Sequence, residues 1–179
     1  MTEDSDDPSV LVVDDEPRVA EGYATWLADD YEVRVATDGD EALAEVAGAG
    51  VVVLDRRMPG RSGDEVLRAL RERDADCRVA MATAVDPERG DAALPFDAYL
   101  TKPVERDELR ATVERLAALS TYADRFYELT SLRVRRNVLE VETNGADEEV
   151  AELNDRIDEL ESRLAAIERA ADIEGRPSV

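Results

Sequence analysis

The chain has 179 residues, and its net charge of −22 disfavours a broad nucleic-acid-binding surface. A hydrophobic fraction of 44% is typical of a folded protein. The sequence contains no histidine, which excludes histidine-based acid–base catalysis, histidine metal sites and a phosphohistidine carrier. Its 22 basic residues include one lysine, Lys102, and this acid-rich, lysine-poor balance resembles proteins of salt-in halophiles.

A single cysteine, Cys77, excludes an intrachain disulfide and fits a reducing, cytoplasmic setting. No apolar run approaches the length that a bilayer-spanning helix needs, so no membrane partner is expected. The N-terminal residues MTEDSDDPS are acidic, which a signal peptide is not. We therefore expect a cytoplasmic protein.

Short β-rich runs alternate with amphipathic helical patterns over the first part of the chain. Two runs, VLVV and VVVL, are continuously apolar, as strands buried on both faces are. Strand–helix repetition of this length predicts βαβ units and a parallel sheet. The predicted strands are Val10–Val13, Glu32–Ala36, Val51–Leu54, Arg78–Ala82 and Ala98–Thr101.

The helices between these strands have readable starts. Pro17 follows two acidic residues and suits the first position of a helix. For the fourth helix only Pro87–Leu94 is available, and we expect one or two turns there. Two further helices begin with predicted capping boxes, which pair Asp38 with Glu41 and Ser62 with Glu65.

After Pro103 the strands stop and two long helices are predicted. The first runs from Arg106 to about Glu142, and Asn144-Gly145 marks a turn. The second runs from about Asp147 to Ile173. Its apolar residues repeat at alternating spacings of three and four, which is a heptad pattern: Val150, Leu153, Ile157, Leu160, Leu164 and Ile167.

This heptad has two structural solutions. In a parallel dimer, Arg156 would face Glu161 and Arg163 would face Glu168 of the partner helix. Alternatively the helix folds back on Arg106–Glu142 as a hairpin within one chain. We favour the hairpin, with a homodimer through its outer face as a further option.

Polar residues follow the predicted strands, where ligands bind in open parallel sheets. With the strand order 2-1-3-4-5, the first and third strands are central neighbours. Three carboxylates, one hydroxyl and the only ammonium of the chain then converge on one site. These residues are Asp14 and Asp15 after the first strand, Asp55 after the third, Thr83 after the fourth and Lys102 after the fifth.

Clustered carboxylates repel one another unless a cation is bound, and Mg²⁺ suits such oxygen ligands. Asp55 would then be a nucleophile that forms an aspartyl-phosphate, with Lys102 neutralising phosphoryl charge and Thr83 donating its hydroxyl. Taken singly, each residue has an ordinary structural explanation. Asp14 and Asp15, for example, could cap the first helix.

Four segments, VVDDE, VVVLDRRMPG, MATA and YLTKP, resemble the signatures of response-regulator receiver domains. The resemblance covers residues 9–119 and implies a flavodoxin-like, doubly wound five-stranded sheet. It implies phosphorylation of Asp55 and a cis peptide at Lys102-Pro103. It further implies Mg²⁺ ligation by Asp14, Asp15, Asp55 and the Arg57 backbone carbonyl, phosphate contact by Lys102, and a switch pair of Thr83 and Tyr99.

The chain also departs from the receiver pattern. The stretch between Thr83 and Lys102 is short, and Pro95-Phe96 precedes Asp97-Ala98-Tyr99 where a Gly-Ala pair is commoner. Residues 120–175 resemble HalX, a helical segment that follows receivers in haloarchaeal regulators. The residues that carry this second resemblance are YADRFYELTSLRVRRNVLEVE.

One local cluster of positive charge lies in the first long helix. Arg133, Arg135 and Arg136 could contact phosphate or a docking partner, or they could form a solvated helical face with acidic neighbours. We favour the solvated face. Residues 105–179 hold 19 acidic and 11 basic side chains, so direct DNA binding is not supported.

The expected function is that of a phosphorelay response regulator and not of an enzyme. A histidine kinase or phosphotransfer protein would phosphorylate Asp55, and the helical segment would carry the signal to an unidentified target. Two alternatives stay open. One is a Mg²⁺-dependent phosphohydrolase with an aspartyl nucleophile, although such enzymes use a D-x-D pattern after the first strand. The other is a non-switching dimeric scaffold.

Overall fold

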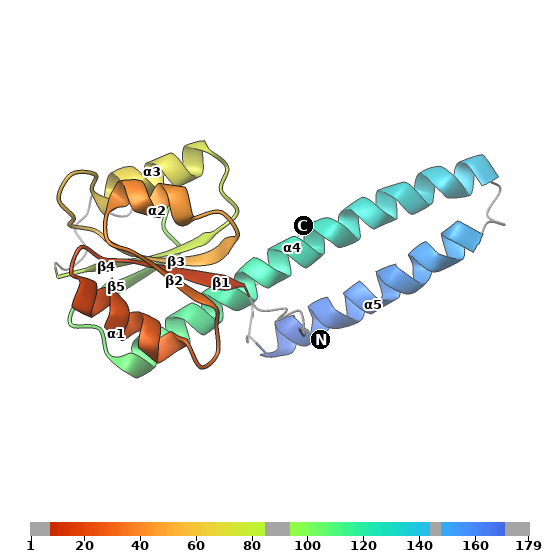
Figure 1. Ribbon diagram of the computed structural model, residues 1–179. Coiled ribbons are helices and arrows are strands. Elements are labelled where there is room, and N and C mark those ends of the chain that lie inside the picture. The colour runs from red at the N-terminus through yellow and green to blue at the C-terminus, as the bar shows by residue number, and fades with distance from the viewer. Residues whose placement is uncertain (1–7, 85–93, 144–147, 171–179) are drawn as a thin grey trace. The chain divides into compact units, whose positions relative to one another are not determined.

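The computed structural model describes residues 8–84, 94–143 and 148–170, which form two compact units divided after Ser120 (Figure 1). The first unit contains a five-stranded sheet in the order β2-β1-β3-β4-β5, with every strand pair parallel. This confirms the predicted doubly wound topology. The strands are β1 (Ser9–Val13), β2 (Val33–Ala36), β3 (Ala49–Asp55), β4 (Arg78–Thr83) and β5 (Ala98–Thr101).

The continuously apolar run of β3 is explained by its central position. All seven residues of β3 are buried, because β1 and β4 flank the strand and helices cover both faces of the sheet. Val13 pairs with Leu54, and Asp55 pairs with Ala82. The carboxyl ends of β1, β3 and β4 therefore lie side by side at one edge of the sheet.

Two apolar clusters fill the two sides of the sheet. One cluster joins the sheet to α1 (Pro17–Leu27) and to the first part of α4 (Arg106–Thr143). The other joins it to α2 (Gly39–Glu45) and α3 (Gly63–Glu72). Figure 1 shows these helix pairs on opposite sides of the strands. Both faces of the sheet are thus covered, as a parallel sheet requires.

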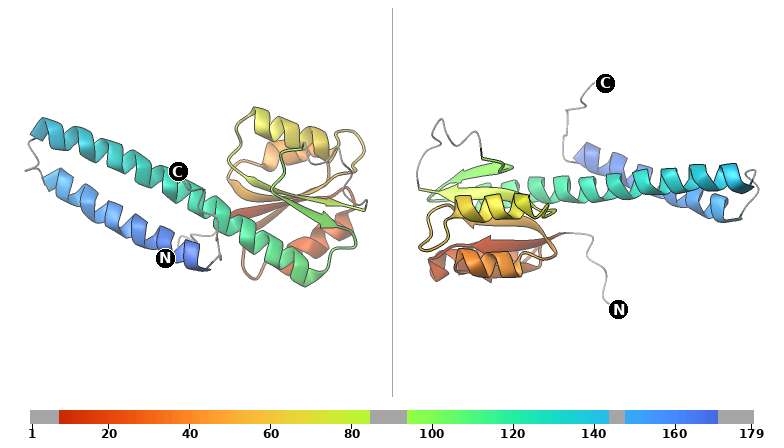
Figure 2. Two further views of the ribbon diagram at one scale, coloured as in Figure 1. Left: turned by 180° about the vertical axis from the view of Figure 1, so that it is seen from behind. Right: turned by 90° about the horizontal axis from the view of Figure 1, so that it is seen from above.

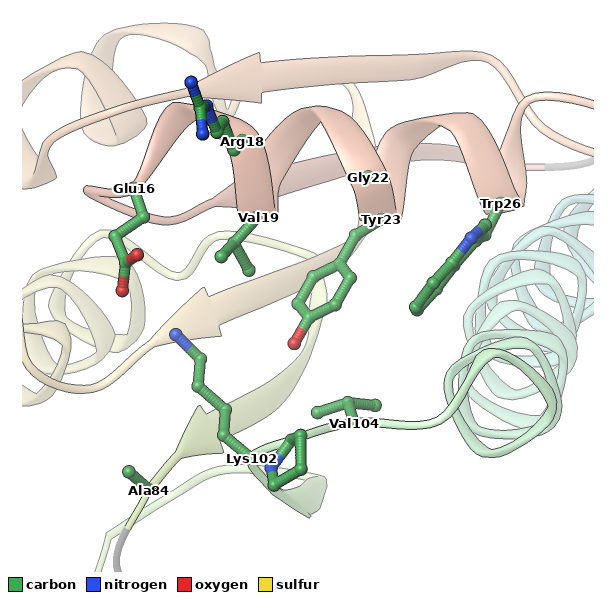
Figure 3. A pocket seen from close by; sticks show the side chains of 10 residues that line it. Glu16, Arg18, Val19, Gly22, Tyr23, Trp26, Ala84, Lys102 and Val104 are labelled. Carbon is green, nitrogen blue, oxygen red and sulfur yellow. The ribbon is translucent and has the colours of Figure 1, made fainter.

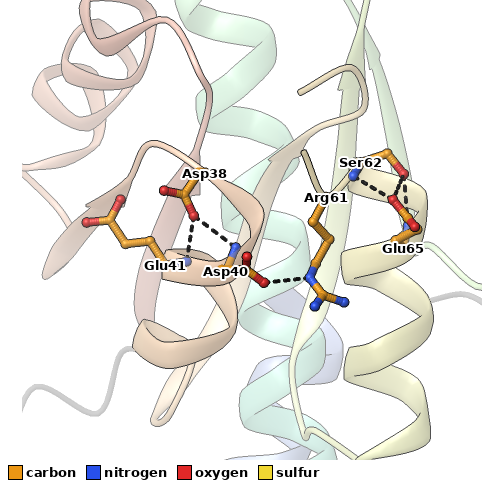
Figure 4. Close-up of polar contacts among 6 residues, drawn as sticks. All are labelled: Asp38, Asp40, Glu41, Arg61, Ser62 and Glu65. Atoms are coloured by element: carbon orange, nitrogen blue, oxygen red, sulfur yellow. Dashed lines mark hydrogen bonds and ion pairs between the residues drawn. The ribbon is translucent and has the colours of Figure 1, made fainter. Parts of the chain in front are cut away.

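The predicted capping box of α3 is confirmed, whereas that of α2 is only half formed (Figure 4). Ser62 Oγ accepts from the Glu65 N–H, and the Glu65 carboxylate accepts from the Ser62 N–H at 2.8 Å. These contacts lower the pKa of Glu65, with the backbone hydrogen bond contributing most. Asp38 likewise accepts from the Glu41 N–H at 2.8 Å, but Glu41 bonds to Thr37.

The second unit is a pair of antiparallel helices, which agrees with the hairpin alternative (Figure 2). It consists of the later part of α4 and of α5 (Glu148–Ala170). Leu129 of α4 packs with three residues of the α5 heptad, which are Ile157, Leu160 and Leu164. The heptad therefore pairs within the chain.

Charged side chains of this unit also pair across the hairpin. Arg156 Nη2 lies 3.0 Å from Glu128 of α4. The parallel dimer would instead pair Arg156 with Glu161 of a partner helix. Each arginine of the local cluster has an acidic partner in the same unit: Arg133 with Glu161, Arg135 with Glu149, and Arg136 with Glu140. Arg133 and Arg135 are exposed, as the solvated face that we favoured requires, whereas Arg136 is partly buried.

Two predicted features lie outside the described residues: the short helix within Pro87–Leu94, except for its last residue, and the Asn144-Gly145 turn. The predicted cis peptide between Lys102 and Pro103 is present. Among the described helices, none combines the length and the apolar character that crossing a bilayer would require.

Candidate functional site

The carboxylates predicted to converge lie at the carboxyl ends of neighbouring strands. Asp55 is the last residue of β3, and Asp14 and Asp15 directly follow β1. One oxygen from each of the three carboxylates lies within 4.8 Å of the other two. Asp14 is 1% exposed and Asp55 is 5% exposed, so two of these acids are removed from water.

Lys102 brings the balancing charge into this cluster. Its Nζ lies 2.6 Å from Asp14 Oδ2 and 3.1 Å from Asp55 Oδ1. The lysine follows β5, and its backbone N–H donates to the carbonyl of Thr83 at 2.7 Å. The same segment therefore ties the ends of β4 and β5 together and aims the ammonium at the acids.

Burial and pairing shift the pKa values of the central pair. Burial raises the pKa of the Asp55 carboxyl, and the Lys102 ammonium only partly offsets this effect. Burial alone would lower the pKa of Lys102, but the hydrogen bonds to Asp14 and Asp55 and the negative charges of these two acids together outweigh burial and raise that pKa. Lys102 therefore stays protonated, while Asp55 resists ionisation more than an exposed aspartate does.

The acids are oriented by local backbone groups. Asp14 Oδ1 accepts from the N–H of Glu16 at 3.0 Å, and Glu16 is the residue that precedes α1. The Glu16 side chain makes no cap hydrogen bond, so α1 begins at Pro17 without a side-chain cap. The Arg57 N–H donates to the Asp55 carboxylate. The Asp14 side chain is thus positioned in the site and does not cap α1.

The two predicted switch residues differ in burial. Thr83 is 1% exposed at the end of β4, beside the end of β5. Tyr99 is partly buried in β5, and its ring lies 5.6 Å from the ring of Phe96, at an interplanar angle of 50°. Phe96, which marks a departure from the family pattern, therefore contacts the predicted switch aromatic directly.

Tyr23 is a site-adjacent residue that the sequence reasoning missed (Figure 3). It is buried on α1, and its hydroxyl points towards the segment that carries Lys102 and Val104. Burial raises the pKa of Tyr23, and the Lys102 ammonium and, to a smaller extent, the backbone hydrogen bond with Val104 oppose this rise. Val19, Tyr23 and Trp26 line a pocket of about 540 Å³ together with this segment. The sequence signal that could have identified Tyr23 is a tyrosine, which carries a polar hydroxyl, on the apolar face of α1.

Gly63 is a second residue that the sequence reasoning missed. A Cβ at this position would lie 2.3 Å from the Asp55 carbonyl oxygen and 2.8 Å from the Arg56 Cα. Only glycine therefore lets α3 begin so close to the end of β3. The Gly63 N–H donates to the Arg56 carbonyl at 3.0 Å, and Arg56 pairs with Asp64 at 3.1 Å. These contacts hold the loop after Asp55.

Comparisons with known proteins agree with this geometry. Residues 10–114 match the family described as response regulator receiver domain. The chain belongs to the response regulator receiver family. Residues 118–176 match the family described as HalX domain, so the receiver is followed by a HalX segment. Receiver-domain relatives are signalling proteins of two-component systems.

Two relatives place this receiver among regulatory proteins. A putative transcriptional regulator of Haloferax volcanii is 41% identical over 160 residues, which cover 88% of this chain and 27% of the relative. The sensory transduction protein RegX3 of Mycobacterium tuberculosis is 42% identical over 111 residues, which cover 59% of this chain and 48% of the relative. The chain thus spans less than half the length of either.

A solved structure supports both the fold and the chemistry of the acidic site. The response regulator TrrA of Thermotoga maritima, solved in complex with Mg(2+)-BeF, is 35% identical with a TM-score of 0.56. The match covers 61% of this chain and 98% of TrrA. Receiver domains bind Mg²⁺ at an acidic pocket, and the three carboxylates of this chain offer the oxygen ligands that Mg²⁺ prefers.

Proposed function

We propose that this chain is a phosphorelay response regulator whose Asp55 accepts a phosphoryl group from a histidine kinase or phosphotransfer protein. The observation that carries the proposal is the position of Asp55, at the end of the central strand among two further acids and Lys102. The role is that of a phosphoacceptor, with at most self-catalysed phosphorylation and dephosphorylation.

Asp55 acts as the nucleophile in the proposed transfer. One carboxylate oxygen forms a bond to phosphorus while the phosphorus–nitrogen bond of the donor phosphohistidine breaks, and the imidazole nitrogen retains the electron pair. Lys102, within 3.1 Å of Asp55, favours the ionised carboxylate and offsets charge on the phosphoryl oxygens. The buried surroundings of Asp55 strengthen both effects, because there is little water to screen them.

Asp14, Asp15, Asp55 and the Arg57 backbone carbonyl would hold Mg²⁺. When bound, the ion neutralises negative charge on the phosphoryl oxygens and on the carboxylates. Lys102 supplies one positive charge against three carboxylates, so the cluster retains net negative charge that favours a divalent cation. The chemistry of this donor set fits Mg²⁺.

Thr83 and Tyr99 would read the phosphorylated state. Thr83 is the last residue of β4, where its hydroxyl would donate to a phosphate oxygen. It pairs with Thr101, the last residue of β5, and Tyr99 lies two residues before Thr101. A change in Tyr99 would alter its contact with Phe96 and shift the receiver between two states. The HalX segment would then carry the signal to a cytoplasmic target.

The experiment that tests this proposal is labelling of the whole chain with acetyl phosphate and Mg²⁺, followed by mass spectrometry. Wild-type protein gains one phosphoryl group, and Asp55→Ala gains none. Asp40→Ala, which changes an exposed acid of α2, is the matched control and labels like wild type. Equal labelling of Asp55→Ala would overturn the assignment, and sustained phosphomonoester turnover would indicate the phosphohydrolase instead.

A further inference from the structure

The later part of α4 has an apolar stripe that α5 does not cover. We define the outer seam as Tyr127, Ser131, Val134 and Val138, all of which are exposed. Tyr127 is 77% exposed, Val134 59% and Val138 52%. Their spacings of four, three and four place them on one line along the helix. Three large apolar side chains exposed on one line, with the small Ser131 between them, are typical of an interaction surface.

The outer seam lies on the opposite side of α4 from the hairpin interior. Tyr122, Leu129 and Leu132 face the α5 cluster. At 3.6 residues per turn, Leu129 lies about 140–180° around the helix axis from the seam residues. In the described residues, α5 therefore buries one face of α4 and leaves the outer seam to another occupant.

The charge around the outer seam differs from that of the whole protein. Residues 121–143 contain four acidic and four basic side chains, whereas the chain carries a net charge of −22. Two copies of the chain repel each other over most of their surfaces, and this neutral stretch is where that repulsion is weakest. Neutrality favours a second copy over a basic partner as the occupant.

Flanking residues give the outer seam a self-complementary pattern. Glu128 and Arg135 lie along one flank, and the uncharged residues Thr130 and Asn137 lie along the other. If a second α4 runs antiparallel, Tyr127 lies opposite Val138 and Ser131 opposite Val134. Glu128 then faces Arg135 of the second copy, and Arg135 faces its Glu128.

A parallel pairing of the same seam lacks this match. Arg135 would face Thr130, and Glu128 would face Ala123, so that no opposite charges meet. Glu128 and Arg135 each have an intrachain partner, in Arg156 and Glu149. Their side chains nevertheless stay 44% and 61% exposed, which leaves room for a second contact.

We propose that the outer seam is the interface of a homodimer in which two α4 helices pack antiparallel. The hairpins then form four helices around two kinds of contact: the buried heptad within each chain and the outer seam between chains. The proposal does not depend on phosphorylation of Asp55, so Asp55→Ala is expected to dimerise like wild type.

Sedimentation of the whole chain in high-salt buffer tests the interface. Wild type is expected to be a dimer, and Val134→Glu to raise the dissociation constant at least about tenfold, because two carboxylates enter an apolar contact. Ala166→Glu adds the same charge at an exposed position of α5 and is expected to leave dimerisation unchanged. A monomeric wild type, or a Val134→Glu dimer as tight as wild type, would overturn the proposal.

Charge reversal separates this interface from the stability of the hairpin. Arg135→Glu alone places a glutamate opposite Glu128 of the other copy in both symmetry-related pairs, so it is expected to weaken the dimer. Adding Glu128→Arg restores opposite pairs between chains, but it leaves the intrachain pairs with Arg156 and Glu149 as like charges. Recovery of the dimer without recovery of the melting temperature supports the proposal, and failure of the dimer to recover contradicts it.

Cysteine cross-linking tests the orientation in a Cys77→Ala background. Tyr127→Cys and Val138→Cys proteins are expected to form a mixed disulfide with each other. Tyr127→Cys alone is expected to form none, because the two copies of residue 127 are about 16 Å apart in the antiparallel register. A disulfide between two copies of Tyr127→Cys would rule out the antiparallel arrangement.

Discussion

The receiver and the hairpin use ion pairs of similar length in different surroundings. In the receiver, Lys102 lies 2.6 and 3.1 Å from Asp14 and Asp55, which are buried. In the hairpin, Arg156 lies 3.0 and 2.9 Å from Glu128 and Glu159, and all three side chains are more than 40% exposed. Removing one partner is costly only where the remaining charge cannot reach water. Distance alone therefore does not rank these contacts.

The apolar core of the receiver is also more enclosed than that of the hairpin. The largest expected effect on stability comes from a substitution in the receiver core. Leu54 is fully buried between layers of the receiver, so Leu54→Ala leaves a cavity and costs about 4 kcal/mol. Leu160 is 1% exposed but lies between only two helices, which can close around the gap, so Leu160→Ala costs about 2 kcal/mol.

Two spectroscopic signals separate these losses. Trp26 is the only tryptophan and lies in α1, so its fluorescence follows receiver unfolding alone, whereas far-ultraviolet circular dichroism follows both units. Leu54→Ala is expected to shift the fluorescence transition, and Leu160→Ala to shift only the dichroism. Equal losses at the two positions would contradict the comparison of the cores.

Lys102→Met is the next largest expected change. It leaves Asp14, Asp15 and Asp55 without their ammonium and lowers the free energy of unfolding by roughly 3 kcal/mol at neutral pH. Lys102 lowers the pKa of Asp55, so its loss raises that pKa further above the unfolded value. The destabilisation is therefore present at neutral pH and is relieved as the pH falls through the raised pKa.

Urea titrations of Lys102→Met with and without Mg²⁺ measure this effect. Mg²⁺ is expected to restore part of the loss, since a cation again sits among the carboxylates. The same urea titration on Arg61→Met, which removes an exposed pair with Asp40, serves as the control and is expected to show little change. A loss for Lys102→Met that persists at low pH would point to packing instead of charge.

Gly63→Ala is expected to cost about 2 kcal/mol, because its Cβ meets the backbone that carries Asp55. It is also expected to slow labelling of Asp55 by acetyl phosphate. Gly22→Ala in α1 is the matched control: apart from the adjacent residues and backbone of its own helix, no atom lies within 4 Å of its Cβ, and helix propensity favours alanine by about 0.5–1 kcal/mol. Wild-type labelling by Gly63→Ala would show that the loop adapts.

The receiver could be predicted further than the hairpin because its pattern is local. Apolar runs followed by acids locate the strand ends, and parallel topology brings Asp14, Asp55 and Lys102 together whatever the loops do. Tyr23 was missed because its role depends on the approach of α1 to the distant segment that carries Lys102. Gly63 was missed because its role depends on how close the start of α3 lies to the backbone of Asp55. No residue pattern announces such contacts before the packing is known.

The hairpin is harder to predict because a heptad fits a partner from either chain. Its pattern fits both a dimer and a hairpin, and only contacts such as Arg156 with Glu128 distinguish them. The capping box predicted for α2 illustrates a similar limit. The Glu41 side chain could accept from the N–H of either Asp38 or Thr37, and it accepts from that of Thr37. The boundaries at 9–119 and 120–175 stay predictions, and the long α4 passes through the point where they meet.

Arg156→Met is expected to have the smallest effect, although this side chain makes two ion pairs. Its loss costs at most about 1 kcal/mol, because Glu128 and Glu159 are hydrated once the guanidinium is gone. Molar salt already screens the pair, so the difference from wild type shrinks further there. Measurement of the dichroism melting curve at low and high salt checks both statements.

A loss for Arg156→Met that matched that of Lys102→Met would mean that exposure does not discount these contacts, and the contrast between the two units would fail. If instead the loss were small at low salt and absent at high salt, the charges of the hairpin would chiefly select its pairing. The free energy that holds α5 to α4 would then come from Leu129, Ile157, Leu160 and Leu164, whose burial persists at any salt concentration.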